Sequence, residues 1–181
     1  MYGSSSEWLT WLGHPAFPGE IGMTRLPGLR SYTLEEDLED MVAEGASTLV
    51  TLNEARELRR LGIDDFGAEV ERAGLAWYHL PIRDFGVPDA DFEAAWIEQG
   101  PELRQRLKTG ERVVLHCYAG LGRTGLVAAR LLIEFGELPV RAIALVRHAR
   151  RGTIQTADQE AYLLRLRLPC RPAKARPFSS W

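Results

Sequence analysis

The sequence predicts an α/β fold in which a central, mostly parallel sheet is flanked by helices. Short apolar segments rich in β-branched residues alternate with longer charged or amphipathic segments, as expected when each strand is followed by a crossover helix. Glycine or proline closes most of these segments and marks their boundaries. The length of 181 residues and the hydrophobic content of 45% suit one core rather than two.

The expected strands are short and apolar. Alternation of Ile21, Met23 and Leu26 predicts a first strand within residues 20–30, which ends at the Pro27-Gly28 pair. Two further strands are expected at 46–52 and 75–82, and a buried apolar run predicts a strand at 112–116.

Seven helices are expected around these strands. The first begins at a capping box formed by Thr33 and Glu36 and ends at Gly45. Pro101 is expected to kink or split a helix at 91–108, because proline removes a backbone donor from the helix interior. The other helices are expected at residues 54–61, 65–73, 123–135, 139–150 and 156–168.

The chain is expected to form one domain at residues 20–168. Residues 1–19 are expected to be an N-terminal extension that packs on this body, because Trp8, Leu9, Trp11 and Leu12 are too apolar for a free tail. Residues 169–181 contain proline and arginine and are expected to form a mobile C-terminal tail.

Composition weighs against several kinds of partner. The net charge is −3, from 22 basic and 25 acidic residues, so neither nucleic acid nor a membrane is expected to bind. A signal peptide and an apolar stretch of about 20 residues are both missing, and two cysteines do not make a disulfide framework. A cytoplasmic protein is therefore expected. Neither a metal nor another cofactor is expected, since no residues have metal-ligand spacing.

The candidate catalytic groups lie in the segment from His116 to Thr124. A buried strand ends at His116, Gly120 and Gly122 permit close backbone approach, and a helix begins near Arg123. Backbone N–H groups of such a loop converge beside a positive helix end and form a cradle for a dianion. The same groups stabilise a thiolate, so Cys117 at the floor of the cradle is a candidate nucleophile. The alternative, a buried structural thiol, leaves the glycines and the arginine unexplained.

The side chains of Arg123 and Thr124 are suited to the same chemistry, which is binding of a phosphoryl group and its release from the thiol. Arg123 lies six positions after Cys117, and its guanidinium can fork onto two phosphoryl oxygens. Thr124 can donate its hydroxyl to the Cys117 sulfur and help it to leave. Contacts to the phosphate are expected from the whole loop, that is from Tyr118, Ala119, Gly120, Leu121, Gly122 and Arg123.

The pattern His-Cys-x-x-Gly-x-x-Arg-Thr at 116–124 resembles the signature of the protein tyrosine phosphatase superfamily. The run Pro-Ile-Arg-Asp-Phe-Gly-Val-Pro-Asp at 81–89 resembles the acid loop of small dual-specificity phosphatases, and residues 152–159 resemble their glutamine loop. Residues 23–28 and 116–118 also resemble the kinase-associated phosphatases, which act on cyclin-dependent kinases. The resemblance implies the cysteine phosphatase fold and a dual-specificity phosphatase domain at residues 20–168.

The same resemblance implies roles for four more residues. Asp84 would be the general acid, and Gln155 would place the attacking water with help from Gln159. His116 would shape the loop and tune the thiolate. Asp89 is a competing acid, but it precedes a helix and is expected to be its N-cap.

The resulting expectation is a two-step hydrolysis of phosphotyrosine and of phosphoserine or phosphothreonine through a phosphocysteine. Phosphorylated proteins or peptides are the expected partners, and the resemblance adds a protein kinase as a further candidate. The interior loop positions Tyr118, Ala119, Leu121 and Gly122 carry no positive charge, which weighs against inositol phosphates. The alternatives are an inactive phosphate-binding or kinase-docking module, a phosphoinositide phosphatase, and a sulfurtransferase or arsenate reductase.

Overall fold

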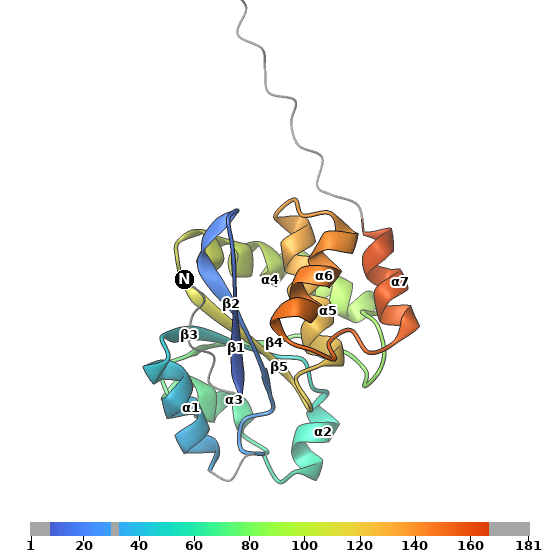
Figure 1. The fold of residues 1–181 in the computed structure, drawn as a ribbon. Coiled ribbons are helices and arrows are strands. Elements are labelled where there is room, and N and C mark those ends of the chain that lie inside the picture. The colour runs from blue at the N-terminus through green and yellow to red at the C-terminus, as the bar shows by residue number, and fades with distance from the viewer. Residues whose placement is uncertain (1–7, 30–32, 167–181) are drawn as a thin grey trace, which may run out of the picture.

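The structure is a computed structural model that describes residues 8–29 and 33–166. A five-stranded sheet in the order β1-β2-β5-β3-β4 lies between two groups of helices (Figure 1). Strands β2, β5, β3 and β4 run parallel, and β1 pairs antiparallel with β2. The predicted mostly parallel sheet is therefore confirmed. The strands are β1 Leu9–His14, β2 Phe17–Arg25, β3 Ala46–Thr51, β4 Ala76–His79 and β5 Arg112–Cys117.

The edge strand β1 was not expected. Residues 9–14 of the predicted N-terminal extension form an antiparallel hairpin with β2, in which Leu9 and Leu12 are buried. A short turn suffices to join two antiparallel strands, so the hairpin adds an edge to the sheet without a crossover helix. The predicted C-terminal tail, residues 169–181, lies outside the described residues.

Seven helices are present in the described part of the chain. The helix α1 begins at the predicted capping box: the Thr33 side chain accepts a hydrogen bond from the Glu36 amide. Gly45 follows it with a φ of +86°, a conformation that glycine adopts readily. The helices are α1 Leu34–Ala43, α2 Ala55–Arg60, α3 Phe66–Arg72, α4 Ala90–Lys108, α5 Gly122–Glu134, α6 Pro139–Ala149 and α7 Ala157–Arg165.

Helix α4 runs through Pro101 as one element, so the predicted split at this proline was wrong, and the alternative, a kink, stays a prediction. Proline removes the backbone donor that would bind the carbonyl of Ile97, one turn earlier. Pro101 is exposed and Ile97 is 75% exposed. Water can therefore reach the freed carbonyl on this side of the helix, which reduces the cost of the missing bond.

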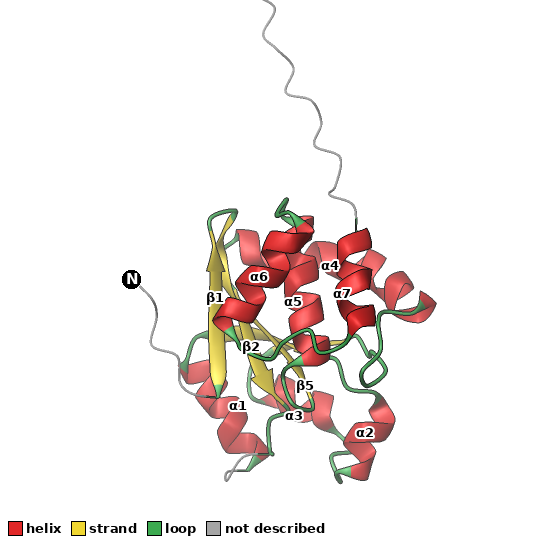
Figure 2. Cartoon of the chain, turned by 45° about the vertical axis from the view of Figure 1, so that its right-hand side comes forward, coloured by secondary structure: helices red, strands yellow, loops and turns green. Residues whose placement is uncertain are grey.

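The two groups of helices bury opposite faces of the sheet. Val113 and Leu115 of β5 join the core under α4–α7, whereas Val114, between them, joins the core under α1–α3. Alternate side chains of a strand point to opposite faces, so a strand buried on both sides is a continuous apolar run. Figure 2 shows α4–α7 grouped together and α1–α3 lying apart from them.

A cluster around Arg130 joins three helices of the larger group. The Arg130 guanidinium of α5 binds both carboxylate oxygens of Glu93 on α4 at 2.7 Å, and its Nε binds Glu134 at 3.0 Å. The Tyr162 hydroxyl of α7 donates to Glu93 at 2.6 Å, and the Trp96 ring lies 4.6 Å from the Arg130 guanidinium carbon. The buried cation is thus paired and hydrogen-bonded, as a desolvated charge requires.

None of the helices within residues 8–29 and 33–166 is both long and apolar enough to cross a bilayer.

Candidate active site

The predicted site residues lie at one edge of the sheet. The four parallel strands all end at this edge, so the loop after β5, the segment after β4 and the start of α2 converge there. Sites in parallel α/β sheets lie outside the carboxyl ends of the strands. The segment before α7 joins the others, because a Cβ added to Gly122 would lie 2.8 Å from Oε1 of Gln155.

The loop after β5 is fixed against the end of β2. Cys117 is the last residue of β5, is 3% exposed and pairs in register with Arg25. Gly120 has a φ of +71°, and a Cβ there would lie 2.3 Å from the carbonyl oxygen of Thr24, so only glycine fits. The Leu26 amide donates to the Tyr118 carbonyl at 3.2 Å. Helix α5 begins at Gly122, which brings its positive end to the loop.

Arg150, which sequence reasoning missed, holds the same loop from the side of β1. Its Nε donates to the Gly120 carbonyl at 2.9 Å, and its Nη1 donates to Oγ1 of Thr10 at 3.1 Å. Burial lowers the pKa of Arg150, while the proximity of Cys117 opposes this change. Arg150 therefore adds a second guanidinium near the predicted nucleophile.

Arg123 is almost completely buried, with 1% of its side chain exposed, and Glu57 of α2 holds it. The two terminal nitrogens of Arg123 donate to the two carboxylate oxygens of Glu57 at 2.6 and 3.0 Å, and Nη1 also donates to the Ile82 carbonyl at 3.1 Å. Such a two-pronged pair fixes the plane of the guanidinium as well as its position. Nε of Arg123 is buried without a hydrogen-bond partner among the described residues, so it is available to a ligand.

Glu57 is itself fixed in several ways. Its carboxylate accepts hydrogen bonds from the Glu54 amide at 2.7 Å and from Nδ2 of Asn53 at 3.2 Å. Partial burial alone would raise the pKa of Glu57, but the bonds from Arg123 and the Glu54 amide outweigh it and leave the pKa below its usual range. Glu57 is therefore ionised at neutral pH. Sequence reasoning missed it, because nothing local distinguishes it from other glutamates of a short charged helix.

Asp84 lies on a tight turn beside Arg123. The Gly86 amide donates to the Arg83 carbonyl at 2.8 Å, and Phe85 between them has a φ of +56°, which is unusual for a bulky residue. Oδ1 of Asp84 lies 3.0 Å from Nη2 of Arg123, although 57% of the Asp84 side chain is exposed. The competing candidate Asp89 accepts a hydrogen bond from the Phe92 amide at 2.9 Å, as expected of the N-cap of α4.

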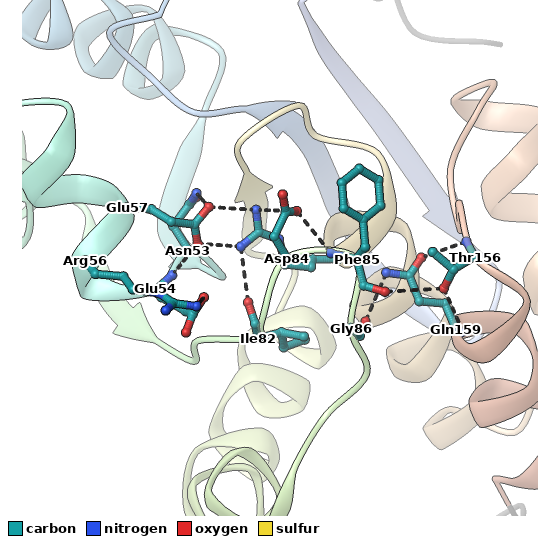
Figure 3. Close-up of polar contacts among 11 residues, drawn as sticks. Asn53, Glu54, Arg56, Glu57, Ile82, Asp84, Phe85, Gly86, Thr156 and Gln159 are labelled. Carbon is teal, nitrogen blue, oxygen red and sulfur yellow. Dashed lines mark hydrogen bonds and ion pairs between the residues drawn. The ribbon is translucent and has the colours of Figure 1, made fainter.

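Gln159 joins the predicted acid and glutamine loops (Figure 3). It is completely buried, its Oε1 accepts from the Gln155 amide at 2.9 Å, and its Nε2 donates to the Gly86 carbonyl at 3.0 Å. The Thr156 hydroxyl adds a contact of 3.5 Å to the Phe85 carbonyl. Through these bonds the Gln159 side-chain amide positions the two loops. The side chain of Gln155, by contrast, is exposed at the site.

His116 and Thr124 are both completely buried next to the loop. Nε2 of His116 lies 2.8 Å from Oγ1 of Thr51, and burial lowers the pKa of His116 to about 3, so its imidazole is neutral at physiological pH. The Thr124 hydroxyl has no hydrogen-bond partner among the described residues. The predicted bond from Thr124 to the Cys117 sulfur is therefore not formed here, and its role in the second step stays a prediction.

The pair between Glu57 and Arg123 gives a testable expectation. Glu57→Gln removes the counter-charge and one acceptor, so the guanidinium loses its fixed plane. We expect kcat to fall by about 10–100-fold, the range found when a residue that orients a catalytic ligand is lost, and the inhibition constant of inorganic phosphate to rise. Steady-state kinetics with an aryl phosphate and phosphate inhibition measure both.

The matched control for this change is Glu71→Gln, which alters an exposed glutamate on α3. A variant that only unfolds more easily has fewer active molecules, but its KM and its inhibition by phosphate are unchanged. That pattern for Glu57→Gln would contradict a positioning role for Glu57.

The chain is similar to several known phosphatases. A family model described as a polymorphic toxin system DSP-PTPase phosphatase matches residues 21–137. The chain is 32% identical over 150 residues to cyclin-dependent kinase inhibitor 3 of Rattus norvegicus, which covers 79% of this chain and 69% of that protein. It is 31% identical over 137 residues to protein tyrosine phosphatase type IVA 3 of Bos taurus, which covers 75% and 72%.

Among solved structures, the fold is similar to that of a kinase-associated phosphatase whose catalytic-site cysteine is replaced by serine. The TM-score is 0.77 at 29% identity, over 89% of this chain and 94% of that one. The fold and the site thus define a cysteine-dependent phosphatase. The chain belongs to the DSP-PTPase phosphatase family.

Membership of this family confirms the predicted fold and the predicted protein-tyrosine or dual-specificity phosphatase activity. The related proteins do not favour an inactive binding module or a phosphoinositide phosphatase.

Proposed function

We propose that Cys117, Arg123, Asp84 and Gln155 carry out a two-step hydrolysis of phosphorylated protein side chains. In the first step the Cys117 sulfur bonds to phosphorus, the bond from phosphorus to the side-chain oxygen breaks, and Asp84 gives that oxygen its proton. In the second step water placed by Gln155 bonds to phosphorus and gives a proton to Asp84, and the thiolate leaves.

The observation that carries this proposal is the position of Arg123. Its guanidinium is buried next to the loop, is oriented by Glu57, and lies 3.0 Å from Asp84. The group that would hold the equatorial phosphoryl oxygens is thus in contact with the group that would protonate the leaving oxygen. Phosphoryl transfer depends mainly on positioning and charge stabilisation, and a fixed cation supplies both.

The substrate class follows from the loop and from the relatives. Uncharged side chains at Tyr118, Ala119 and Leu121 support phosphotyrosine, phosphoserine and phosphothreonine in proteins as substrates. The name of one relative, cyclin-dependent kinase inhibitor 3, supports a protein kinase as a candidate partner of this chain.

The test is to trap the covalent intermediate. During turnover of an aryl phosphate, a denaturing quench followed by peptide mass spectrometry is expected to find phosphate on Cys117. A panel of phosphopeptides then ranks phosphotyrosine against phosphoserine and phosphothreonine. Absence of turnover at every pH between about 5 and 7.5, where acid and thiolate catalysis normally operate, would contradict the proposal.

A further inference from the structure

A cavity of about 410 Å³ opens beside the phosphate loop. Arg56, Arg60 and Leu61, from α2 and its C-terminal end, line one part of it, and Asp84 and Tyr118 line another. Because Asp84 and Tyr118 also belong to the candidate active site, the cavity is continuous with that site. When the phosphorylated residue of a substrate is bound at Cys117, the substrate residues next to it would therefore lie along this cavity.

The carboxylates that line the cavity already have cationic partners. Glu54 binds Arg56 at 2.8 Å, while Glu57 and Asp84 both face Arg123. Arg60 differs from these groups. Within residues 8–29 and 33–166, Arg60 forms neither a hydrogen bond nor an ion pair through its side chain, and it is exposed. The cavity thus presents one unpaired cation to a ligand.

The remaining walls are partly apolar. Leu61 is 38% exposed and Tyr118 is 49% exposed, so both offer apolar surface beside the Arg60 side chain. An acidic group on a short carbon stem matches this combination, because its stem can contact the apolar walls while its charge meets the guanidinium.

We propose that this cavity is a substrate subsite that binds a second acidic group of the same phosphoprotein, with Arg60 as the residue that determines specificity. The inference rests on the proposed function, since it places the phosphorylated residue at Cys117. The acidic group is a carboxylate or a second phosphate, which share the chemistry that a guanidinium recognises.

The chain offers a matched control in Arg59. This arginine precedes Arg60 on α2 and is also exposed, but it does not line the cavity. Arg59→Glu and Arg60→Glu change the net charge of the protein equally. A difference between the two variants therefore reports a local contact, because a general attraction of acidic peptides would respond to both.

The experiment measures kcat/KM for three phosphotyrosine peptides. Each peptide is made as a series in which one position at a time, on either side of the phosphotyrosine, is changed. The changed position carries glutamate in the first series, phosphothreonine in the second and glutamine in the third. We expect the wild type to prefer the acidic peptides at one of these positions by about three- to fivefold, as for a partly exposed ion pair. Arg60→Glu is expected to abolish or reverse this preference, whereas Arg59→Glu keeps it. The preference should also weaken as salt is raised.

Three results would overturn the subsite. The first is that the wild type hydrolyses acidic and neutral peptides equally at every position. The second is that both variants lose the preference together, and the third is that Arg60→Glu retains it. Comparison of the glutamate peptides with the phosphothreonine peptides identifies whether the acidic group is a carboxylate or a phosphate. Turnover of an aryl phosphate by the wild type is measured in parallel, so failure of the proposed function is distinguished from failure of the subsite alone.

Discussion

Replacement of Cys117 by serine is expected to abolish phosphatase turnover while phosphopeptide binding persists. Serine has nearly the same shape, so the loop fixed by Gly120 and Tyr118 keeps its contacts to β2. A serine hydroxyl does not ionise near neutral pH, so the anionic nucleophile is lost. Loss of a catalytic nucleophile typically reduces kcat by about 10⁵–10⁶-fold.

The measurement combines steady-state kinetics on an aryl phosphate with binding of a fluorescent phosphotyrosine peptide. Cys170→Ser, which changes the other cysteine of the chain, is the control and should retain activity. If Cys117→Ser kept more than a few per cent of the wild-type turnover, another residue would have to be the nucleophile.

Asp84→Asn is expected to reduce kcat by about 10²–10⁴-fold, the usual contribution of a general acid. Asparagine is close in size to aspartate, but it cannot donate the proton that the leaving oxygen needs. The loss should be largest for phosphopeptides, whose leaving oxygen is strongly basic, and smallest for an aryl phosphate with a very acidic phenol. This dependence on the leaving group separates proton donation from a simple change in the ion pair with Arg123.

Asp89→Asn serves as the control for this experiment. Asparagine is a good N-cap, so this variant should keep the start of α4 and the activity. Unchanged kinetics in Asp84→Asn would move the acid role to Asp89 or to Asp91, which lies in the first turn of α4. A marked loss in Asp89→Asn would favour Asp89.

Much of the site could be predicted because its key residues are close together in the sequence. The six positions from Cys117 to Arg123 place a strand end, a glycine loop and a helix start in one short segment, and local rules describe each part. The same holds for the capping box at Thr33 and for the N-cap at Asp89. The central sheet followed from the alternation of apolar and amphipathic segments.

The residues that were missed depend on contacts between distant segments. Glu57 and Arg123 are 66 positions apart, and Arg150 reaches Gly120 across 30 positions. Their local sequences resemble ordinary exposed charged helices, so no periodicity marks them. The continuous helix at Pro101 was missed for a similar reason. A proline inside α4 is tolerated because that side of the helix faces solvent, and the local sequence does not show which side this is. Strand β1 was missed because the apolar residues Trp8 and Trp11 are equally compatible with a packed extension and with a strand.

The cluster at Arg130 has a consequence for how heat inactivates the enzyme. Helix α4 follows the loop of Asp84, α5 follows the loop of Cys117, and α7 follows the loop of Gln155. Arg130 and Glu93, with the Tyr162 hydroxyl, hold these three helices together without touching any of the proposed catalytic groups. The same cluster thus stabilises the packing of α4, α5 and α7 and the positions of the catalytic loops that precede them. We therefore expect loss of activity and melting of these helices to occur at the same temperature.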